Sequence, residues 1–206
     1  NLLTVILSNA SLLEGAAHLD DDERASVDEI LAAAERSAAL TQQLLAFGSQ
    51  DELEAQTLEL DAVLEGFAPL LERMLSGPVE LVLEPGAPDE HLLANSTQLE
   101  QIVLNLVVNA GEAIEGAGRI TVRTGRGGAP SRALEASLGA PGDEIVWVQV
   151  EDDGRGIPAD ELGQIFEPFY SAHERVEGSG LGLSIVHGLI EQLDGAAHVD
   201  SAPGQG

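Results

Sequence analysis

A change in hydrophobic periodicity near residue 50 constrains the fold more than any other feature of this sequence. Apolar side chains recur at helical spacing in residues 1–15, and in residues 22–47 they follow alternating steps of four and three. Such steps place side chains on one face of a helix. Beyond a connector at 48–54, short apolar runs alternate with longer helical patterns. We therefore expect a helical hairpin in residues 1–50 and a second domain in residues 51–206.

The hairpin is expected to dimerise. A lone pair of helices cannot bury both of its apolar faces, and the pattern in residues 22–47 is a heptad seam. Pairing of residues 1–48 with a second copy of the chain would complete a four-helix bundle, which makes a homodimer. Packing of the hairpin against the rest of the same chain is the alternative.

The second domain is expected to be α+β, an α/β sandwich in which helices cover one face of one mixed sheet. Ser96 or Thr97 is expected to cap the central helix. Residues 125–143 are rich in Gly, Ala and Pro and are expected to form a surface loop, and residues 153–182 are expected to hold turns. The strands are predicted at 57–60, 79–83, 91–94, 119–123, 144–151 and 198–201, and the helices at 61–75, 96–115 and 183–193.

The charge and composition exclude several classes of partner. Asp and Glu number 36 against nine basic residues, all of them Arg, so the net charge is −27. Such a chain repels nucleic-acid backbones and anionic membrane surfaces. An acidic proteome explains this composition better than a dedicated cationic partner does. Cysteine is absent, which excludes disulfides, and no apolar run reaches the ~20 residues of a membrane span. We expect a cytoplasmic location.

Two asparagines, Asn105 and Asn109, interrupt an otherwise apolar helical stretch. Residues four apart share a helix face. In a helix that is mostly buried, such amides need hydrogen-bond partners, although a pair of water-facing polar positions is the plain alternative. Amide oxygens suit a hard cation such as Mg²⁺, whose coordination substrate phosphates usually complete. The pair is therefore a candidate for a magnesium and phosphate site.

Two glycine-containing turns follow in the sequence. In Val150–Pro158, glycines permit close approach of the backbone to a ligand, and Asp152 can accept the exocyclic amine of a purine; an ordinary Asp-Gly turn is the alternative. Residues 178–183 open a helix, where glycine-rich backbone N–H groups form an anion cradle; a flexible linker is the alternative. This second motif follows no strand and lacks a Lys-Ser/Thr pair, so it is neither a Rossmann fingerprint nor a P-loop.

The order of these motifs carries a resemblance to a known family. The asparagine helix, the Asp-Gly-x-Gly turn, Ile165-Phe-Glu-Pro-Phe169 and Gly-x-Gly-Leu-Gly occur in that order. The combination resembles the ATP-binding domain shared by histidine kinases, gyrase and heat-shock ATPases, over roughly residues 55–206. Within that superfamily it is most similar to a sensor histidine kinase of a two-component system. Residues 1–48 resemble the dimerisation helices of that family more loosely.

The resemblance implies roles for single residues around ATP and Mg²⁺. Asn109 is the implied Mg²⁺ ligand, and Asn105 stands where hydrolysing relatives carry a Glu that acts as a base for water. Because Asn cannot act as a base, transfer to a protein side chain is favoured over hydrolysis. Asp152 is implied to hold adenine. The other implied ATP-binding residues are Gly154, Gly156 and Ile157 beside Asp152, Phe166 and Phe169 at the lid, and Gly178, Gly180, Leu181, Gly182 and Leu183 at the phosphates.

The resemblance also covers the two ends of the chain. Asn1-Leu-Leu-Thr-Val-Ile6 is similar to the family segment that follows the phospho-accepting His, which would lie four residues before Asn1. Asn1 falls where the family aligns a water that dephosphorylates its partner. Related lids often carry Lys at the position of His173, near the phosphates. Either His173 or Arg175 replaces that cation here, or neither does. Gly204-Gln-Gly206 resembles the last glycine turn of the family.

The implied function is that of an ATP-dependent protein-histidine kinase core. It would transfer the γ-phosphoryl group of ATP to a His of the dimerisation helix, and from there to an Asp in the receiver domain of a response regulator. A non-catalytic adaptor that dimerises and docks response regulators is one alternative, and the intact motifs argue against it. A Ser kinase or ATPase on the same fold, such as an anti-sigma factor, is another, and the helical hairpin argues against that.

Overall fold

The computed structural model describes residues 55–75, 77–128, 145–170 and 180–206, and single positions at 13, 24, 26, 27, 30, 131, 134 and 137. The chain divides into two compact units, Asn1–Asp51 and Glu52–Gly206. Most of the predicted hairpin lies outside the described residues. The architecture below is therefore that of the second unit.

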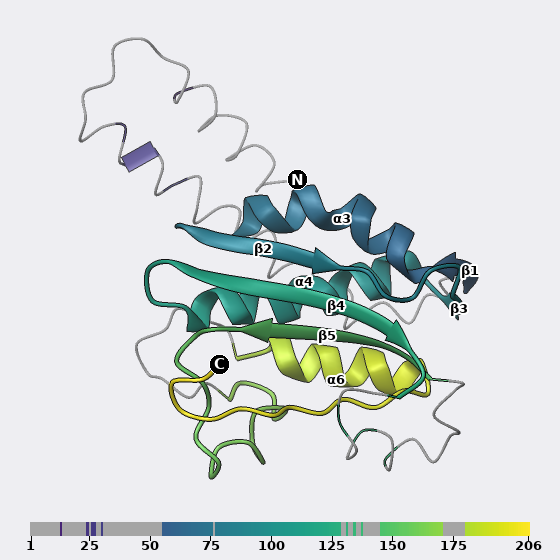
Figure 1. Cartoon of the computed structure of the whole chain (residues 1–206). Helices are drawn as coiled ribbons and strands as arrows, with labels where there is room; N and C mark the ends of the chain where they lie inside the picture. The colour runs from purple at the N-terminus through teal and green to yellow at the C-terminus, as the bar shows by residue number, and fades with distance from the viewer. Residues whose placement is uncertain are drawn as a thin grey trace. The chain divides into compact units, whose positions relative to one another are not determined.

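The three longest strands form one mixed sheet. β2 (Val79–Glu84), β4 (Gly118–Arg126) and β5 (Val146–Asp152) lie in the order β2-β4-β5 (Figure 1). β2 runs parallel to β4, and β5 runs antiparallel to it. Two shorter strands, β1 (Gln56–Glu59) and β3 (His91–Ala94), pair with each other in a separate antiparallel sheet. This separate pair is an addition to the mixed sheet that the sequence predicts.

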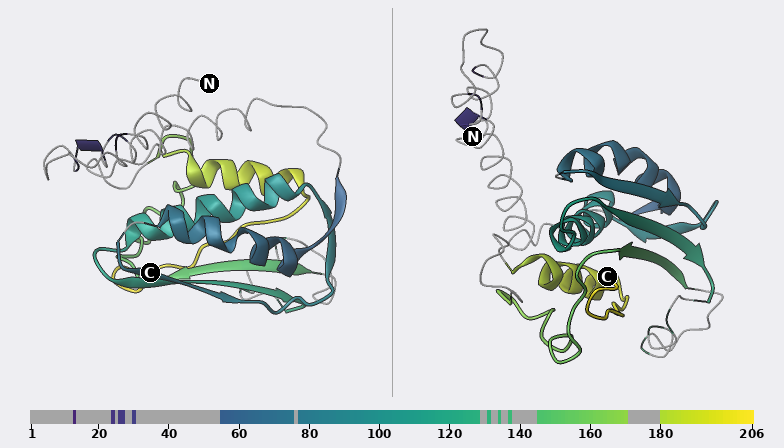
Figure 2. Two further views of the ribbon diagram at one scale, coloured as in Figure 1. Left: turned by 90° about the horizontal axis from the view of Figure 1, so that it is seen from above. Right: turned by 60° about the vertical axis from the view of Figure 1, so that its left-hand side comes forward.

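Three helices cover one face of the mixed sheet. They are α3 (Leu60–Met74), α4 (Ser96–Ala113) and α6 (Gly182–Gln192), and both views in Figure 2 place them on the same side. Along β4, Ile120 and Val122 alternate toward the helices and are 0% and 2% exposed. Packing between α4 and α6 adds a second apolar cluster, in which Ile102 meets Val186. The predicted α+β class, with helices on one face of a mixed sheet, is confirmed.

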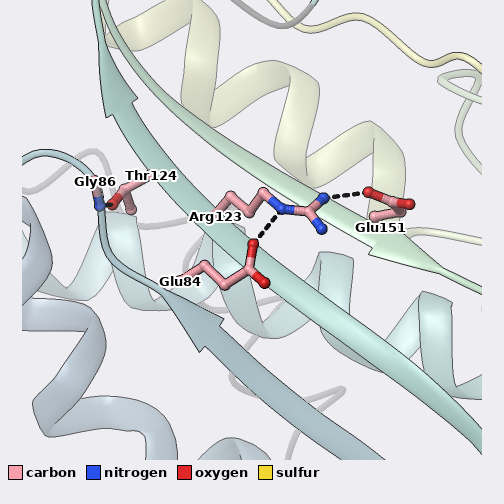
Figure 3. A network of polar contacts seen from close by, with 5 residues as sticks. All are labelled: Glu84, Gly86, Arg123, Thr124 and Glu151. Carbon is pink, nitrogen blue, oxygen red and sulfur yellow. Dashed lines mark hydrogen bonds and ion pairs between the residues drawn. The ribbon is translucent and has the colours of Figure 1, made fainter.

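The other face of the sheet is polar. Arg123 of β4 lies between Glu84 of β2 and Glu151 of β5 and pairs with both (Figure 3). Arg119 pairs in the same way with Glu80, at 2.9 Å. Exposed ion pairs contribute only about 0–1 kcal/mol each. These pairs therefore make the face compatible with water and add little stability.

A buried carboxylate fixes the start of α3. Asp61 is 7% exposed, accepts the Thr124 hydroxyl of β4 at 2.5 Å and accepts the Ala87 N–H at 3.1 Å. Acidic side chains are favourable in the first turn of a helix, where they meet unpaired N–H groups. Here the carboxylate is instead used to join α3, β4 and the loop after β2.

The structure corrects three local predictions. Asn95, and not Ser96 or Thr97, caps α4: its backbone is extended and its side chain accepts the Thr97 N–H at 2.8 Å. Gly125 and Arg126 belong to β4 and not to the loop predicted at 125–143. Residues 198–201 form no strand, because the chain beyond them hydrogen-bonds to the turn at 154–155 and not to β5. No helix in the described part of the chain is long and apolar enough to cross a membrane.

Candidate functional site

The C-terminal half of α4 carries both predicted asparagines. Asn105 is 1% exposed, and its Nδ2 donates to the Gln101 carbonyl one turn earlier at 2.9 Å. Asn109 lies one turn later on the same face and is half-buried. Its Nδ2 is buried and has no hydrogen-bond partner among the described residues. Buried amides are nearly always paired in folded proteins, so this one is available to a ligand.

The first residue of α6 lies against the Asn109 amide. A Cβ atom on Gly182 would lie 3.0 Å from both Oδ1 and Nδ2 of Asn109. That separation is tighter than ordinary van der Waals contact, so any larger residue would displace the amide. The glycine thus allows the start of α6 to approach α4 closely. Two of the three predicted motifs meet here.

The turn after β5 gives two adjacent carboxylates different surroundings. Asp152 ends β5 on the face that Val150 presents to the helices, because side chains alternate along a strand. Its Oδ1 accepts the Gly154 N–H at 2.8 Å. Asp153 is exposed, and its Oδ1 accepts the backbone N–H of Arg119 at 2.9 Å, which ties the end of β5 to the start of β4. Of the two, Asp152 is the one on the helix side.

The surroundings of Asp152 disfavour its charge. Burial raises the pKa of the Asp152 carboxyl, and the nearby carboxylates of Asp153 and Glu151 raise it further. The hydrogen bond from the Gly154 N–H acts against this and lowers the pKa. A half-buried carboxylate held in this way gains more than an exposed one from a hydrogen-bond donor on a ligand.

The same turn packs against the end of α4. The Arg155 N–H donates to the Ala113 carbonyl at 3.0 Å. A Cβ on Gly154 would lie 2.7 Å from that carbonyl oxygen, so glycine is needed for this approach. Ala113 lies one helical turn beyond Asn109. The asparagine helix, the aspartate turn and the glycine-rich helix start therefore meet along one stretch of α4.

The last residues described, 201–206, pack on the aspartate turn. The Gly206 N–H donates to the Gly154 carbonyl at 3.2 Å, and the Gly204 N–H donates to the Arg155 carbonyl at 2.6 Å. The Ser201 hydroxyl accepts the Ile157 N–H at 2.8 Å and donates to the Gly206 carbonyl at 2.6 Å. Sequence reasoning singled out the glycines of this turn and missed Ser201, because a lone serine near a glycine pair gives no signal.

The predicted lid residues separate into two environments. The ring of Phe166 packs against the ring of His187 in α6, with centroids 5.3 Å apart. Phe169 is 76% exposed and has a positive φ of 67°. Its N–H donates to the Gly180 carbonyl at 2.9 Å, and the absence of a side chain on Gly180 permits this approach. Phe166 is thus attached to the helix layer, and Phe169 lies at the surface beside Gly180.

The remaining predicted residues are placed as follows. Leu181 precedes α6 and its carbonyl accepts the Ser184 hydroxyl at 2.9 Å, while Leu183 lies half-buried in the first turn of α6. Asn1, His173 and Gly178 lie outside the described residues, as does Arg175. Their predicted roles stay predictions.

A divalent cation at this site would be coordinated mainly by the phosphates of a bound substrate and by water. The described residues include no group of three or more His, Cys, Asp or Glu side chains arranged to hold a metal ion. The residue that fits the predicted cation is Asn109, whose Oδ1 lies at the start of α6. Its unpaired buried Nδ2 is a donor and suits a phosphate oxygen of the same ligand. One amide oxygen is a sufficient protein contribution when substrate phosphates and water complete the shell of Mg²⁺.

Among known proteins, this chain is similar to proteins named as sensor kinases. Sensor kinase CckA of Brucella abortus is 38% identical over 206 residues, covering all of this chain and 22% of that protein. Sensory histidine kinase/phosphatase NtrB of Rhodobacter capsulatus is 35% identical over 208 residues, covering all of this chain and 56% of that protein. The chain therefore spans between about a fifth and about half of the relatives that it matches.

A solved structure gives the same fold. The full-length structure of ShkA in complex with AMPPNP superposes with a TM-score of 0.67 and 26% identity, covering 99% of this chain and 41% of that one. Residues 94–206, more than half of the chain, match the family described as Histidine kinase-, DNA gyrase B-, and HSP90-like ATPase. That span begins at the end of β3 and contains α4, the aspartate turn and α6. The chain is a member of this family of ATPases and is related to sensor histidine kinases.

Proposed function

We propose that this chain is the catalytic core of a protein-histidine kinase in a two-component system. Residues 51–206 bind ATP with Mg²⁺, and residues 1–50 form the dimerisation and phosphotransfer hairpin. The γ-phosphoryl group passes to a His on the dimerisation helix, and then to an Asp in the receiver domain of a response regulator. The protein acts as a homodimer through residues 1–48, on the cytoplasmic side.

The observation that carries the proposal is the contact between Asn109 and Gly182. An amide with a buried, unpaired Nδ2 lies where a glycine opens a helix. Helix N-termini attract phosphate through their unpaired N–H groups and the helix dipole. An amide oxygen beside that terminus is suited to hold the Mg²⁺ of a nucleotide. The unpaired Nδ2 of Asn109 has no evident use in packing the domain.

The other end of the nucleotide would lie at Asp152. Purine recognition through an exocyclic amine needs a carboxylate that is partly withdrawn from water and fixed in orientation. Asp152 meets both needs, since it is half-buried and bonded to the Gly154 N–H. In this arrangement Ile157 and Phe166 border the base, and Gly178, Gly180 and Gly182 lie toward the phosphates.

Asn105 favours transfer over hydrolysis. Its buried amide donates to the Gln101 carbonyl, and an amide cannot take a proton from water. In phosphoryl transfer, most of the rate comes from positioning and from stabilising the charge on the transferred group. The bound Mg²⁺ supplies part of that charge stabilisation. Asn109 and the N–H groups at the start of α6 orient the phosphates so that the attacking His lies in line.

The proposal is tested on the full-length protein that contains this chain. Incubated with γ-labelled ATP and Mg²⁺, it should acquire a label that acid removes and alkali preserves, as expected for phosphohistidine. The label should then move to a response regulator. Asn109→Ala should abolish labelling, whereas Gly188→Ala, which fills open space in the middle of α6, should preserve it. An acid-stable label would indicate a Ser kinase, and failure to bind any nucleotide would indicate the adaptor.

A further inference from the structure

The segment 201–206 and the aspartate turn are joined through one serine hydroxyl. Ser201 Oγ accepts the Ile157 N–H at 2.8 Å and donates to the Gly206 carbonyl at 2.6 Å. It therefore holds one end of the turn 154–157 and the last residue of the segment at the same time. The hydroxyl uses both its donor and an acceptor position in these two contacts.

A continuous path of hydrogen bonds leads from this hydroxyl to the Asp152 carboxylate. Gly206, held by Ser201, donates its N–H to the Gly154 carbonyl at 3.2 Å. Gly154 in turn donates its own N–H to Asp152 Oδ1 at 2.8 Å. The position of Gly154 thus affects the orientation of the carboxylate, and Ser201 acts on Gly154 through Gly206.

The packing around this path leaves little room for adjustment. A Cβ on Gly206 would overlap the Asp152 carbonyl oxygen, and a Cβ on Gly156 would overlap the Ala202 carbonyl oxygen. Both glycines have positive φ, 80° and 69°, which other residues adopt at a cost. Two backbones at such close approach keep their relative position only while the bonds between them hold.

We propose that Ser201 is a positioning residue for adenine recognition, which orients the Asp152 carboxylate through Gly206 and Gly154. This inference rests on the proposed function, because it assumes that Asp152 receives the exocyclic amine of the base. It predicts that Ser201 affects selectivity for adenine and not only the stability of the fold. Three hydrogen bonds separate the hydroxyl from the carboxylate, so Ser201 acts through the backbone of Gly206 and Gly154.

The test compares ATP with inosine triphosphate, which carries a carbonyl in place of the exocyclic amine. Ser201→Ala in the full chain should weaken ATP binding about threefold to tenfold, as expected for the loss of one or two hydrogen bonds, and should leave inosine triphosphate binding unchanged. Ser201→Thr, which keeps the hydroxyl, should restore the selectivity. Ser96→Ala makes the same change at the first residue of α4, whereas the aspartate turn packs against the last. It should alter neither the affinity for ATP nor the affinity for inosine triphosphate.

Hydrogen exchange gives a second measurement that does not depend on nucleotide. The Ile157 amide should exchange faster in Ser201→Ala, below the temperature at which either protein unfolds. Equal weakening of both nucleotides, or an unchanged selectivity ratio, would overturn the role of Ser201 while the proposed function stands. A wild-type chain that binds neither nucleotide would instead remove the proposed function itself. A wild-type chain that binds both equally would remove recognition of the amine by Asp152, and with it the role of Ser201.

Discussion

Asp153 Oδ1 accepts the backbone N–H of Arg119 at 2.9 Å, whereas the preceding carboxylate, Asp152, accepts the N–H of Gly154 within its own turn. One of two adjacent acidic residues therefore connects two strands, and the other lies on the side of the helices. The pattern Glu-Asp-Asp-Gly alone does not distinguish them, and it is the family resemblance that singles out Asp152. Their contacts do, and they lead to opposite expectations for substitution.

Replacing Asp152 by Asn should weaken nucleotide binding without loss of stability. An amide oxygen can still accept the Gly154 N–H, but the negative charge that attracts the purine amine is lost. Since burial disfavours the charged form of Asp152, the variant should be at least as stable as the wild type. Affinity should fall by roughly tenfold or more, as for a charge-assisted hydrogen bond. Fluorescent-nucleotide titration and urea unfolding measure the two effects.

Replacing Asp153 by Ala should lower the stability of the fold and leave nucleotide affinity nearly unchanged. The Arg119 N–H loses its acceptor, which should cost about 1 kcal/mol of unfolding free energy. Nucleotide affinity should stay within about twofold of the wild type. An Asp153 variant that loses affinity as strongly as Asp152→Asn would show that the assignment of the two carboxylates is wrong.

Gly182→Ala should separate binding from stability at the start of α6. Alanine is the better helix former by up to about 1 kcal/mol, but its Cβ would meet the Asn109 amide at 3.0 Å. We expect nearly unchanged thermal stability and clearly weaker binding of Mg-nucleotide. Gly188→Ala is the matched control, because nothing lies within 4 Å of its Cβ position. It should raise stability and leave binding intact; weakened binding in both variants would refute the role of the contact.

Nucleotide affinity should depend on pH through Asp152. Burial and two neighbouring carboxylates raise the pKa of this carboxyl in the folded protein. The folded state thus binds this proton more tightly than the unfolded state, and the contribution of Asp152 to stability falls as pH rises between the unfolded and folded pKa values. Affinity changes in the opposite direction, since protonation removes the charge that attracts the purine amine.

The measurement is a titration of nucleotide affinity from about pH 8 down to about pH 4, with the wild type and Asp152→Asn side by side. As the pH falls, the wild type should lose affinity at a higher pH than it would if Asp152 had the pKa of an exposed aspartate. The difference between the two proteins should disappear once Asp152 is protonated. Parallel curves across the whole range would show that Asp152 does not titrate against the ligand.

Asp61→Ala should destabilise the domain without a direct effect on nucleotide binding. The substitution leaves the Ala87 N–H and the Thr124 hydroxyl without their buried acceptor. Buried groups that lose a charged partner cost roughly 2–3 kcal/mol of unfolding free energy. Thr124→Val removes the donor to Asp61 and the acceptor of the Gly86 N–H. It keeps the bond from the Ala87 N–H to Asp61 and should cost less. Denaturant unfolding of the wild type, Asp61→Ala and Thr124→Val gives their order of stability. Equal stability of the three proteins would contradict the role of Asp61.

Much of the fold could be predicted because its patterns are strong and local. The alternation of β4 and β5 and the helical spacing of α3, α4 and α6 follow from burial on one face of each element. The α4 cap was predicted one or two residues late, since Asn95, Ser96 and Thr97 all favour that position and backbone conformation decides among them. The prediction of a strand at residues 198–201 is wrong, because hydrophobic periodicity does not show which partners the backbone hydrogen bonds will have.

The site was predicted through motifs and not through geometry. Spacing placed Asn105 and Asn109 on one helix face, but only the fold shows that Asn105 is bonded to Gln101 while the Nδ2 of Asn109 has no partner among the described residues. The contact of Asn109 with Gly182 joins positions 73 residues apart in the sequence. Ser201 was missed for the same reason, because its partners belong to a turn more than 40 residues earlier.

The central claim is that Asn109 holds the cation of a bound adenine nucleotide at the start of α6. Isothermal calorimetry of AMPPNP binding, with Mg²⁺ and with chelator, tests it most directly on the wild type and Asn109→Ala. The wild type should bind at least about tenfold more tightly with Mg²⁺, and the variant should lose that dependence while keeping its melting temperature. Equal Mg²⁺ dependence in both proteins would contradict the account.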